Sequence, residues 1–271
     1  VTFKEEGTNF TNSVMVGDSD TGTLSSATGN TALGIDVFAA LTSGINNVAV
    51  GYAAMTALTS AYSNVAVGAN ALDSLTSGHT SVAVGHNALA GVTTAAYNIG
   101  IGTNAGVALT TGAGNTVVGA NSLNAGTTAV NNVVLGGYSA TSITDGIGNT
   151  ITGTVSSIAL TTGDYNVNSG YAAGYAITTG DANICMGASA GLHLTTGSNN
   201  IAIGVNALNG ATTVSNQTAV GYQALQSLTT GEANTSVGYI ALKLDTTGSY
   251  NAALGQNALG SNTTASSNTG L

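Results

Sequence analysis

Hydrophobic and polar positions recur along this chain with a period of seventeen residues, and a glycine marks every repeat. We number each residue by its remainder after division by 17, with this glycine at position 17. Positions 14 and 16 are mostly Val, Ile, Leu or Thr, and a small residue separates them, as in Val48-Ala49-Val50. β-Branched residues before a glycine predict a short strand that ends in a bend. A fixed period indicates one structural unit stacked many times.

Each repeat has room for one coil of a β-solenoid, but not for a strand, a helix and two loops. Position 3 is mostly alanine, positions 4 and 7 are commonly leucine, and Leu-Thr-Thr-Gly at positions 7 to 10 predicts a second edge with its turn. The sequence therefore predicts an all-β, parallel β-solenoid with 17-residue coils over residues 29–271. Residues 1–28 are predicted to form an atypical N-terminal capping region, because a terminal repeat must cover an open end. The predicted turn glycines are Gly17, Gly34, Gly51, Gly68, Gly85, Gly102, Gly119, Gly136, Gly153, Gly170, Gly187, Gly204, Gly221, Gly238 and Gly255.

Position 13 is asparagine in nearly every repeat, with Ser13, Ser81 and Gln217 as polar exceptions. In a parallel stack, equivalent residues lie one strand spacing apart, about 4.8 Å. Each side-chain amide can then donate to the next one, so that a buried polar column satisfies itself. Threonine at position 8 predicts a second ladder. The predicted asparagine ladder comprises Asn30, Asn47, Asn64, Asn98, Asn115, Asn132, Asn149, Asn166, Asn183, Asn200, Asn234 and Asn251.

The predicted strand is apolar on both faces, one with positions 14 and 16 and the other with position 15. One face fills the coil, and the other needs a partner, since soluble monomers avoid a long exposed apolar stripe. A neighbouring copy of the chain is the simplest partner. We therefore expect lateral assembly.

Composition narrows the range of partners. The 271 residues include no proline, which fits continuous main-chain ladders, and the formal net charge is −9 with only two basic residues. This balance argues against a nucleic-acid partner, and no apolar run approaches the roughly 20 residues of a membrane-spanning helix. The single cysteine, Cys185, occupies position 15 and is expected to be a small buried filler. The chain starts at Val1 without an initiator methionine, and we expect it to be a piece of a longer protein.

Three features break the pattern. The first is charge near the start, at Lys4, Glu5, Glu6, Asp18 and Asp20. The second is a set of polar residues in strand columns, at Thr152, Asn168 and Ser169, which predicts a local change of cross-section or a hydrogen-bonded layer. The third is glycine at position 4 in Gly106, Gly174 and Gly191, where we expect a thinner coil.

Candidate chemistry is sparse, and we expect no cofactor, no metal and no catalytic residue. His79, His86 and His193 fall in different columns and are predicted to be surface residues, with metal binding as the alternative. Asp18 and Asp20 are predicted to be a solvated cap, with a cation site as the alternative. The candidate surface contacts are the tyrosines of position 1, whose rings either stack on sugars or cover apolar surface. They are Tyr52, Tyr171, Tyr222 and Tyr239, and position 12 adds Tyr97, Tyr165 and Tyr250.

Segments of the repeat resemble those of two known repeat families. Asn46-Asn47-Val48-Ala49-Val50-Gly51, with Ser81–Gly85 and Asn200–Gly204, resembles the head repeats of trimeric autotransporter adhesins. The longer unit Asn64–Leu72, followed by Leu75–Gly78, looks more like the repeats of bacteriophage tail fibres. The resemblance implies a left-handed parallel β-roll, three chains side by side as a homotrimer, and surface attachment to a cell-surface glycan or receptor. The adhesin unit is usually shorter than 17 residues, and the self-cleaving chaperone domain of many tail fibres is absent here.

Three functions compete at this point. The first is the shaft or head of an extracellular or virion attachment fibre without catalysis, which the unbroken period favours. The second is an ice-binding solenoid, motivated by the threonine ladder, although adjacent threonines at positions 8 and 9 point to opposite sides of a regular strand. The third is a fibre-borne depolymerase, for which Asp145, Asp164 and Asp181 are the available carboxylates. Exposed turn residues are the simpler interpretation of these aspartates.

Overall fold

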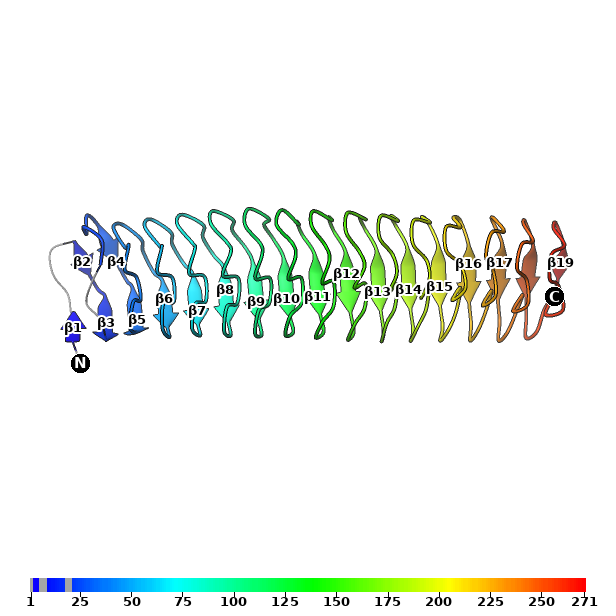
Figure 1. Ribbon diagram of the computed structural model, residues 1–271, viewed down its shortest axis with the longest axis horizontal. Helices are drawn as coiled ribbons and strands as arrows, with labels where there is room; N and C mark the ends of the chain where they lie inside the picture. Colours follow the sequence, from blue (N-terminus) through cyan, green and yellow to red (C-terminus); the bar gives the residue numbers. More distant parts are fainter. Residues whose placement is uncertain (1, 5–8, 18–20) are drawn as a thin grey trace. The chain divides into compact units, whose positions relative to one another are not determined.

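The computed structural model describes residues 2–4, 9–17 and 21–271, and every regular element in them is a β-strand. The chain divides into two compact units, Val1–Asn131 and Asn132–Leu271. In both units, parallel strands recur every seventeen residues, with one strand per coil from β6 onward, as Figure 1 shows. The prediction of an all-β parallel solenoid with 17-residue coils is thus confirmed. The handedness of the coil and the number of chains stay predictions.

Unit 1 begins with the only antiparallel pairing among its described residues, between β1 (Thr2–Lys4) and β3 (Val14–Gly17). The parallel series β3, β5, β6, β7, β8, β9 and β10 follows, with Val48 opposite Val65 as an example of the register. A small second sheet pairs β2 with β4. The remaining bounds are β2 (Phe10–Thr11), β4 (Ala27–Thr28), β5 (Thr31–Gly34), β6 (Val48–Val50), β7 (Val65–Val67), β8 (Val82–Val84), β9 (Ile99–Ile101) and β10 (Thr116–Val118).

Unit 2 is a single parallel series in which each strand pairs with the next. Its register keeps equivalent positions opposite one another, as in Cys185 against Ala202. The strands are β11 (Val133–Leu135), β12 (Thr150–Thr152), β13 (Val167–Ser169), β14 (Ile184–Met186), β15 (Ile201–Ile203), β16 (Thr218–Val220), β17 (Thr235–Val237), β18 (Ala252–Leu254) and β19 (Thr269–Gly270).

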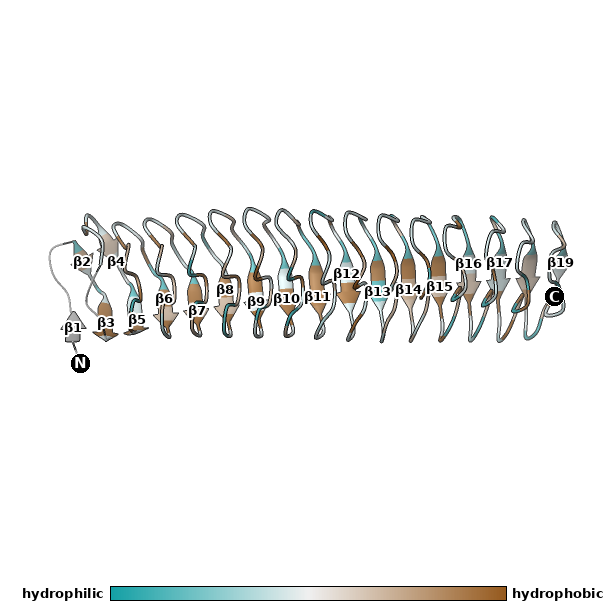
Figure 2. Cartoon of the chain, viewed as in Figure 1, coloured by the Kyte–Doolittle hydropathy of each residue, from teal (hydrophilic) through white to brown (hydrophobic). Residues whose placement is uncertain are grey.

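The two faces of each strand have different surroundings. Position 15 points into the coil, where Ala49, Ala66 and Ala83 are completely buried against the alanines and leucines of positions 3, 4 and 7. Positions 14 and 16 point outward, so the strand is buried on one face only within a single chain. The expected second edge at positions 7 to 10 is mostly a bend. Strands β2 and β4 lie at positions 10 and 11, and isolated bridges such as Ile45 to Tyr62 continue the pairing at position 11. Figure 2 shows strongly hydrophobic strands, such as β9, β11, β14 and β15, whereas β13 is hydrophilic.

The glycine column follows from backbone geometry. Gly51 has φ +133°, a region that side chains strongly disfavour, and an added Cβ would lie 2.6 Å from the carbonyl oxygen of Gly68 in the next coil. The coils therefore approach too closely at this corner for any side chain. Positions 2, 4 and 12 also have positive φ, for example Leu72 at 50°, so each coil contains several left-handed residues besides its glycine. These residues close a coil of only seventeen residues.

In many coils a small residue at position 15 or 4 is accompanied by a larger residue at the other position. Alanine at position 15 goes with leucine at position 4 six residues later, as in Ala66 and Leu72, both of them buried. At Gly174, an added Cβ would lie 2.7 Å from the side-chain amide of Asn168, and at Gly191 it would lie 2.5 Å from Sγ of Cys185. We expected thinner coils at these glycines. Instead, the larger residue at position 15 fills the space at Gly174 and Gly191. At Gly106 position 15 is Gly100, and an added Cβ would lie 2.8 Å from Cδ2 of Leu89 in the preceding coil.

Candidate functional site

The asparagine column connects each coil to its neighbours on both sides. Nδ2 of Asn183 donates to Oδ1 of Asn166 (3.1 Å) and to the carbonyl of Gly197 (2.9 Å). Oδ1 of Asn183 accepts from the backbone N–H and from Nδ2 of Asn200, both at 3.0 Å. The amide-to-amide bonds are those expected from the sequence, whereas the bond to the carbonyl at position 10 of the next coil was not foreseen. Since these side chains are completely buried, each bond replaces one that water would otherwise make.

The exceptions in this column keep part of the pattern. Oε1 of Gln217 accepts from the N–H of Asn234, and Nε2 of Gln217 donates to the carbonyl of Gly231. The hydroxyl of Ser81 accepts from the N–H of Asn98. The common requirement at position 13 is therefore an acceptor for the backbone N–H of the next coil.

A second amide ladder was missed by the sequence analysis. Asn70, Asn87, Asn104 and Asn121 occupy position 2, and Nδ2 of each of the first three donates to Oδ1 of the next at 2.9–3.1 Å. All four have φ between 53° and 56°, a conformation that asparagine tolerates better than most residues. The sequence feature that could have revealed this ladder is asparagine at position 2 in four consecutive repeats.

The threonines of position 8 use their hydroxyls inside the structure. Oγ1 of Thr59 donates to the carbonyl of Thr76 (3.1 Å), and the N–H of Thr59 donates to the same oxygen. The same pair of hydrogen bonds recurs in unit 2, where Oγ1 and the N–H of Thr178 both donate to the carbonyl oxygen of Thr195. The ladder at position 8 thus joins backbones, and its hydroxyl protons point to carbonyl groups instead of solvent.

Two of the candidate carboxylates also bond to the backbone. Oδ1 of Asp164 accepts from the N–H of Ile147 (2.7 Å), and Oδ1 of Asp181 accepts from the N–H of Asp164 (2.8 Å). Serine does the same at position 11 in later coils, as Ser198 does for Asp181. Asp145 is exposed and accepts from Oγ1 of Thr144. Asp164 and Asp181 therefore have a structural use that serine also fulfils.

The polar break in unit 2 is a hydrogen-bonded layer. Oγ1 of Thr152 donates to Oγ of Ser169 on the outer face (2.7 Å), and Nδ2 of Asn168 donates to Oγ of Ser157 inside the coil (2.7 Å). Oδ1 of Asn168 is buried and has no hydrogen-bond partner, alone in this among the described side chains. Such an orphaned acceptor costs about 1–3 kcal/mol, so this coil is a local weak point.

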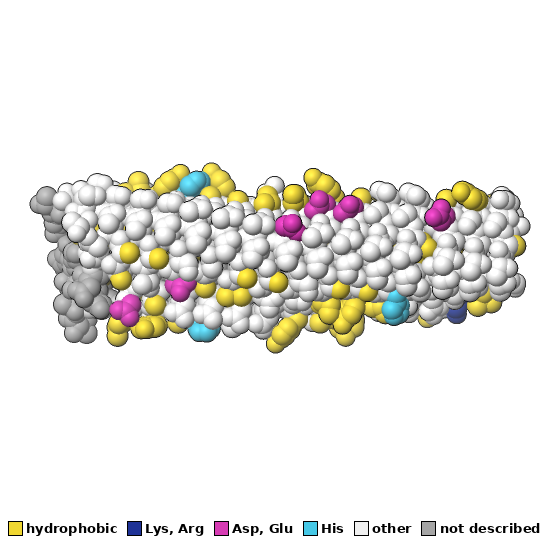
Figure 3. Space-filling model, turned by 45° about the horizontal axis from the view of Figure 1, so that its top comes forward, with side chains coloured by type: hydrophobic (Ala, Val, Ile, Leu, Met, Phe, Trp, Pro, Cys, Tyr) yellow, Lys and Arg dark blue, Asp and Glu magenta, His cyan; other side chains and the backbone are white. Residues whose placement is uncertain are grey.

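An apolar surface column runs along the strands of each unit at positions 14 and 16. In unit 1, Val67, Val84, Ile99 and Ile101 are 36–40% exposed, and in unit 2 Leu135, Met186 and Ile203 are similar. Figure 3 shows only a few charged side chains on the face that it displays. Threonine or serine interrupts this column in some coils, as at Thr150, Thr152 and Ser169. Aliphatic side chains that recur at this exposure in so many coils are unusual for the surface of a monomer.

The tyrosines separate into stacked and unstacked groups. Tyr222 and Tyr239 stack with ring centroids 5.4 Å apart. His79 is half-buried between Tyr62, with which it stacks, and Tyr97, which meets it edge-on. The prediction of a plain surface histidine missed these contacts, because Tyr62 in the same column was not considered. Tyr52 and Tyr171 protrude from their coils at 57% and 64% exposure.

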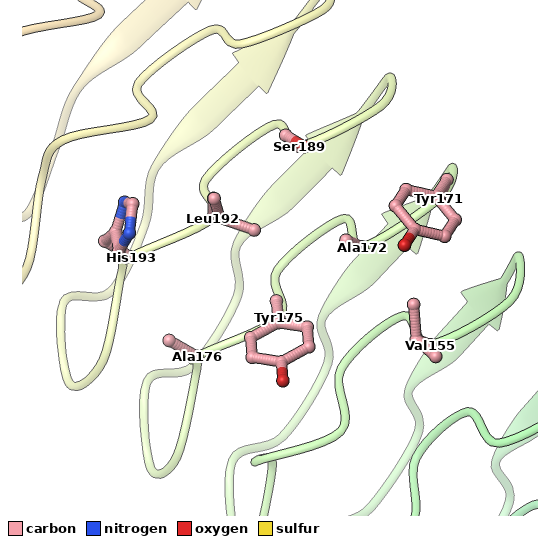
Figure 4. Close-up of a pocket in the computed structure, with 8 residues that line it drawn as sticks. All are labelled: Val155, Tyr171, Ala172, Tyr175, Ala176, Ser189, Leu192 and His193. Atoms are coloured by element: carbon pink, nitrogen blue, oxygen red, sulfur yellow. The ribbon is translucent and has the colours of Figure 1, made fainter.

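A hollow of about 430 Å³ lies in unit 2 over the turns that follow β12, β13 and β14 (Figure 4). Tyr171 and Tyr175 rise from the same coil, and Leu192 and His193 come from the next one. The remaining lining residues are smaller, namely Val155, Ala172, Ala176 and Ser189. The sequence analysis selected Tyr171 and His193 but missed Tyr175. The sequence feature that could have pointed to Tyr175 is the presence of two tyrosines four residues apart, at positions 1 and 5 of one repeat.

The imidazole of His193 is oriented by a neighbouring coil. Its Nδ1 lies 2.8 Å from the carbonyl oxygen of Asn209. Because a carbonyl only accepts, Nδ1 carries the proton, and Nε2 of the neutral ring is an acceptor. His193 therefore brings a polar atom of defined character to the edge of an apolar hollow.

Other candidates give no site. Burial raises the pKa of the Cys185 thiol from 9.0 to about 12, so the cysteine is a core residue with little thiolate at neutral pH. In the described ranges, no group of three or more His, Cys, Asp or Glu side chains is placed to hold a metal ion. Among the same residues there is no helix with the length and apolarity that crossing a bilayer requires. Asp18 and Asp20, with Glu5 and Glu6, lie outside the described residues, and so does the side chain of Lys4.

Comparison with known proteins adds no relative. No family model, no curated protein and no solved structure matches the chain. The class of protein defined by the fold is therefore a parallel β-solenoid with 17-residue coils, and function has to be argued from its surfaces.

Proposed function

We propose that this chain is a structural repeat segment of an extracellular or virion attachment fibre, in which copies of the chain associate side by side, most simply as a homotrimer. The observation that supports the proposal is the apolar column at positions 14 and 16 of both units. It carries no charged residue and repeats with the coil period, so a second copy in parallel register meets like residues throughout. Burying it at about 25 cal/mol per Å² makes association favourable.

The internal ladders support the same role. Buried amides, threonine hydroxyls and backbone groups join each coil to the next, so bending a unit would break many bonds at once. Few charged groups take part in these bonds, and we therefore expect stability to change little with salt. A stiff segment with few charged side chains suits a fibre exposed to the environment.

The test is the solution mass together with the particle shape. We expect light scattering to give three times the 26.1 kDa chain mass at micromolar concentration, and electron microscopy to show slender rods. A monodisperse single chain, or compact globules in the images, would contradict the proposal.

The ice-binding alternative has weaker support. An ice-binding face needs regularly spaced hydroxyl groups directed at water. Oγ1 of Thr59 and of Thr178 instead donate to carbonyl groups of the next coil. Thermal hysteresis measured at millimolar protein concentration tests this alternative, and we expect none.

A further inference from the structure

We infer that the hollow bounded by Tyr171, Tyr175 and His193, called here the tyrosine groove, binds a neutral saccharide. The inference states which class of ligand this surface binds. Only the biological role of that binding rests on the proposed attachment function. Its physical basis lies within unit 2 and does not depend on lateral assembly.

The groove has the size and composition of a small-molecule site. Its volume of about 430 Å³ lies within the range of roughly 300–1,000 Å³ that is typical of ligand pockets. Ala172 and Ala176 are small, while Tyr171 and Tyr175 are large, so the rings bound a depression whose lining is mostly apolar. A ligand placed there meets aromatic carbon together with tyrosine hydroxyl groups and the imidazole of His193.

The charge of the site selects a neutral ligand. No Asp, Glu, Lys or Arg lines the groove, and the chain has a net charge of −9. A bound anion would be repelled by this net charge and would find no basic partner, and a cation would find no carboxylate. The charges therefore favour an uncharged ligand.

The arrangement of apolar and polar groups selects a saccharide among neutral ligands. A pyranose ring has a face of C–H groups surrounded by hydroxyls, and a tyrosine ring offers an apolar face next to a polar tip. In the tautomer that donates from Nδ1 to Asn209, Nε2 of His193 can accept from a hydroxyl. The hydroxyls of Ser189 and of the two tyrosines can both donate and accept.

The other tyrosines lack this arrangement. Tyr52 also occupies position 1, but Thr56 stands at position 5 of its repeat. Tyr222 and Tyr239 stack on each other, so each already covers one face of its partner. A second copy of the chain is a less suitable occupant, since the column proposed for lateral contact uses positions 14 and 16, whereas the groove uses positions 1, 2, 5 and 6.

Saturation-transfer NMR on the whole chain tests the inference. The probes are neutral hexasaccharides of glucose (α- and β-linked), xylose, mannose and N-acetylglucosamine at millimolar concentration, with oligogalacturonate as the charged comparison. We expect at least one neutral probe to bind. We expect Tyr171→Ala and Tyr175→Ala to weaken it about tenfold, because each removes an aromatic contact with the sugar.

Two further variants separate stacking from general damage. Tyr175→Phe keeps the ring and is expected to bind within about twofold of the natural chain, whereas Tyr52→Ala removes a tyrosine of the same column elsewhere and is expected to change nothing. Far-UV circular dichroism verifies that each variant is folded. The inference is overturned if no neutral probe binds, if oligogalacturonate binds more tightly than every neutral probe, or if Tyr52→Ala weakens binding as much as Tyr175→Ala does. Light scattering on the same samples reports lateral association separately, so failure of one proposal is distinguishable from failure of the other.

Discussion

Sγ of Cys185 occupies the place where a side chain at Gly191 would begin, since a Cβ built on Gly191 would lie 2.5 Å from that sulfur. The two residues are six positions apart and belong to successive coils. Elsewhere the same pair of columns holds alanine and leucine, as in Ala202 and Leu208. At these pairs the core thus conserves volume across two positions while exchanging which of them is large.

This relationship predicts a non-additive pair of substitutions. We expect Gly191→Ala to destabilise the protein by about 1–3 kcal/mol, because the new methyl group overlaps the sulfur in a core without free space. In the double variant with Cys185→Ala the overlap disappears. Alanine fits the left-handed backbone of position 4, since Ala140 stands there with φ 52°.

Urea unfolding of the two single variants and the double variant measures the coupling. We expect the double variant to be more stable than the sum of the single effects predicts, by about 1–2 kcal/mol. Additive effects would show that the residues do not compete for the same space.

The asparagine column predicts a large loss from a single truncation. Asn183→Ala removes both donors to Asn166 and Gly197, and it leaves the buried N–H of Asn200 without its acceptor. Each orphaned group costs about 1–3 kcal/mol, so we expect a loss of about 3–5 kcal/mol.

The matched control is Asn199→Ala, one residue before the buried column. Asn199 is exposed at position 12, where Ala182 occurs naturally with the same left-handed backbone. We expect a change of less than about 0.5 kcal/mol in its free energy of unfolding. Similar losses at Asn183 and Asn199 would contradict a special role for the ladder.

The apolar column predicts that one charge disrupts lateral association. Ile203→Asp places a carboxylate at a position that is 37% exposed in the single chain and buried in the proposed assembly. Desolvating that charge without a partner is costly, so we expect the mass to fall to that of one chain. Thr196→Asp adds the same charge at an exposed bend outside the column, and we expect it to leave the mass unchanged. Light scattering decides between these outcomes.

Burial of the Cys185 thiol predicts a pH dependence with a definite sign. Its pKa is raised from 9.0 to about 12, so the folded state retains a proton that the unfolded chain releases above pH 9. This contribution to stability is fully present below pH 9 and is lost as the pH rises to about 12, with a limiting slope of about 1.4 kcal/mol per pH unit.

Comparison with Cys185→Ala isolates this effect from the pH dependence of every other group, because the variant lacks only the thiol. We expect the urea midpoint of the natural chain to fall more steeply between pH 9 and pH 11 than that of the variant. Equal slopes would show that the thiol is accessible in the folded state, and rapid alkylation of the native protein at pH 8 would show the same.

Several features were predictable because they repeat. A residue type that recurs every seventeen positions marks a column, and in a parallel stack each column makes the same contact in every coil. The parallel solenoid and the need for glycine at position 17 followed from this rule. So did the amide-to-amide bonds between Asn166 and Asn183.

Other features depend on how each coil closes, which no period reveals. The left-handed residues at positions 2, 4 and 12 direct position 13 toward the carbonyl of position 10, and position 15 toward position 4. The bond from Asn183 to Gly197 and the competition between Cys185 and Gly191 follow from that closure. Tyr175 was missed for the same reason, since it occupies a column without other aromatic residues.

The sequence by itself determined the period, the fold class and the identity of the buried polar columns, because stacking turns each repeated residue into a ladder whatever the shape of the coil. Only the tertiary structure decided which strand face is enclosed, which columns share one volume, and where Tyr171, Tyr175 and His193 meet. The physical reason is that contacts along a column depend only on translation from coil to coil. Contacts across the coil depend on the turns that bring separate columns together.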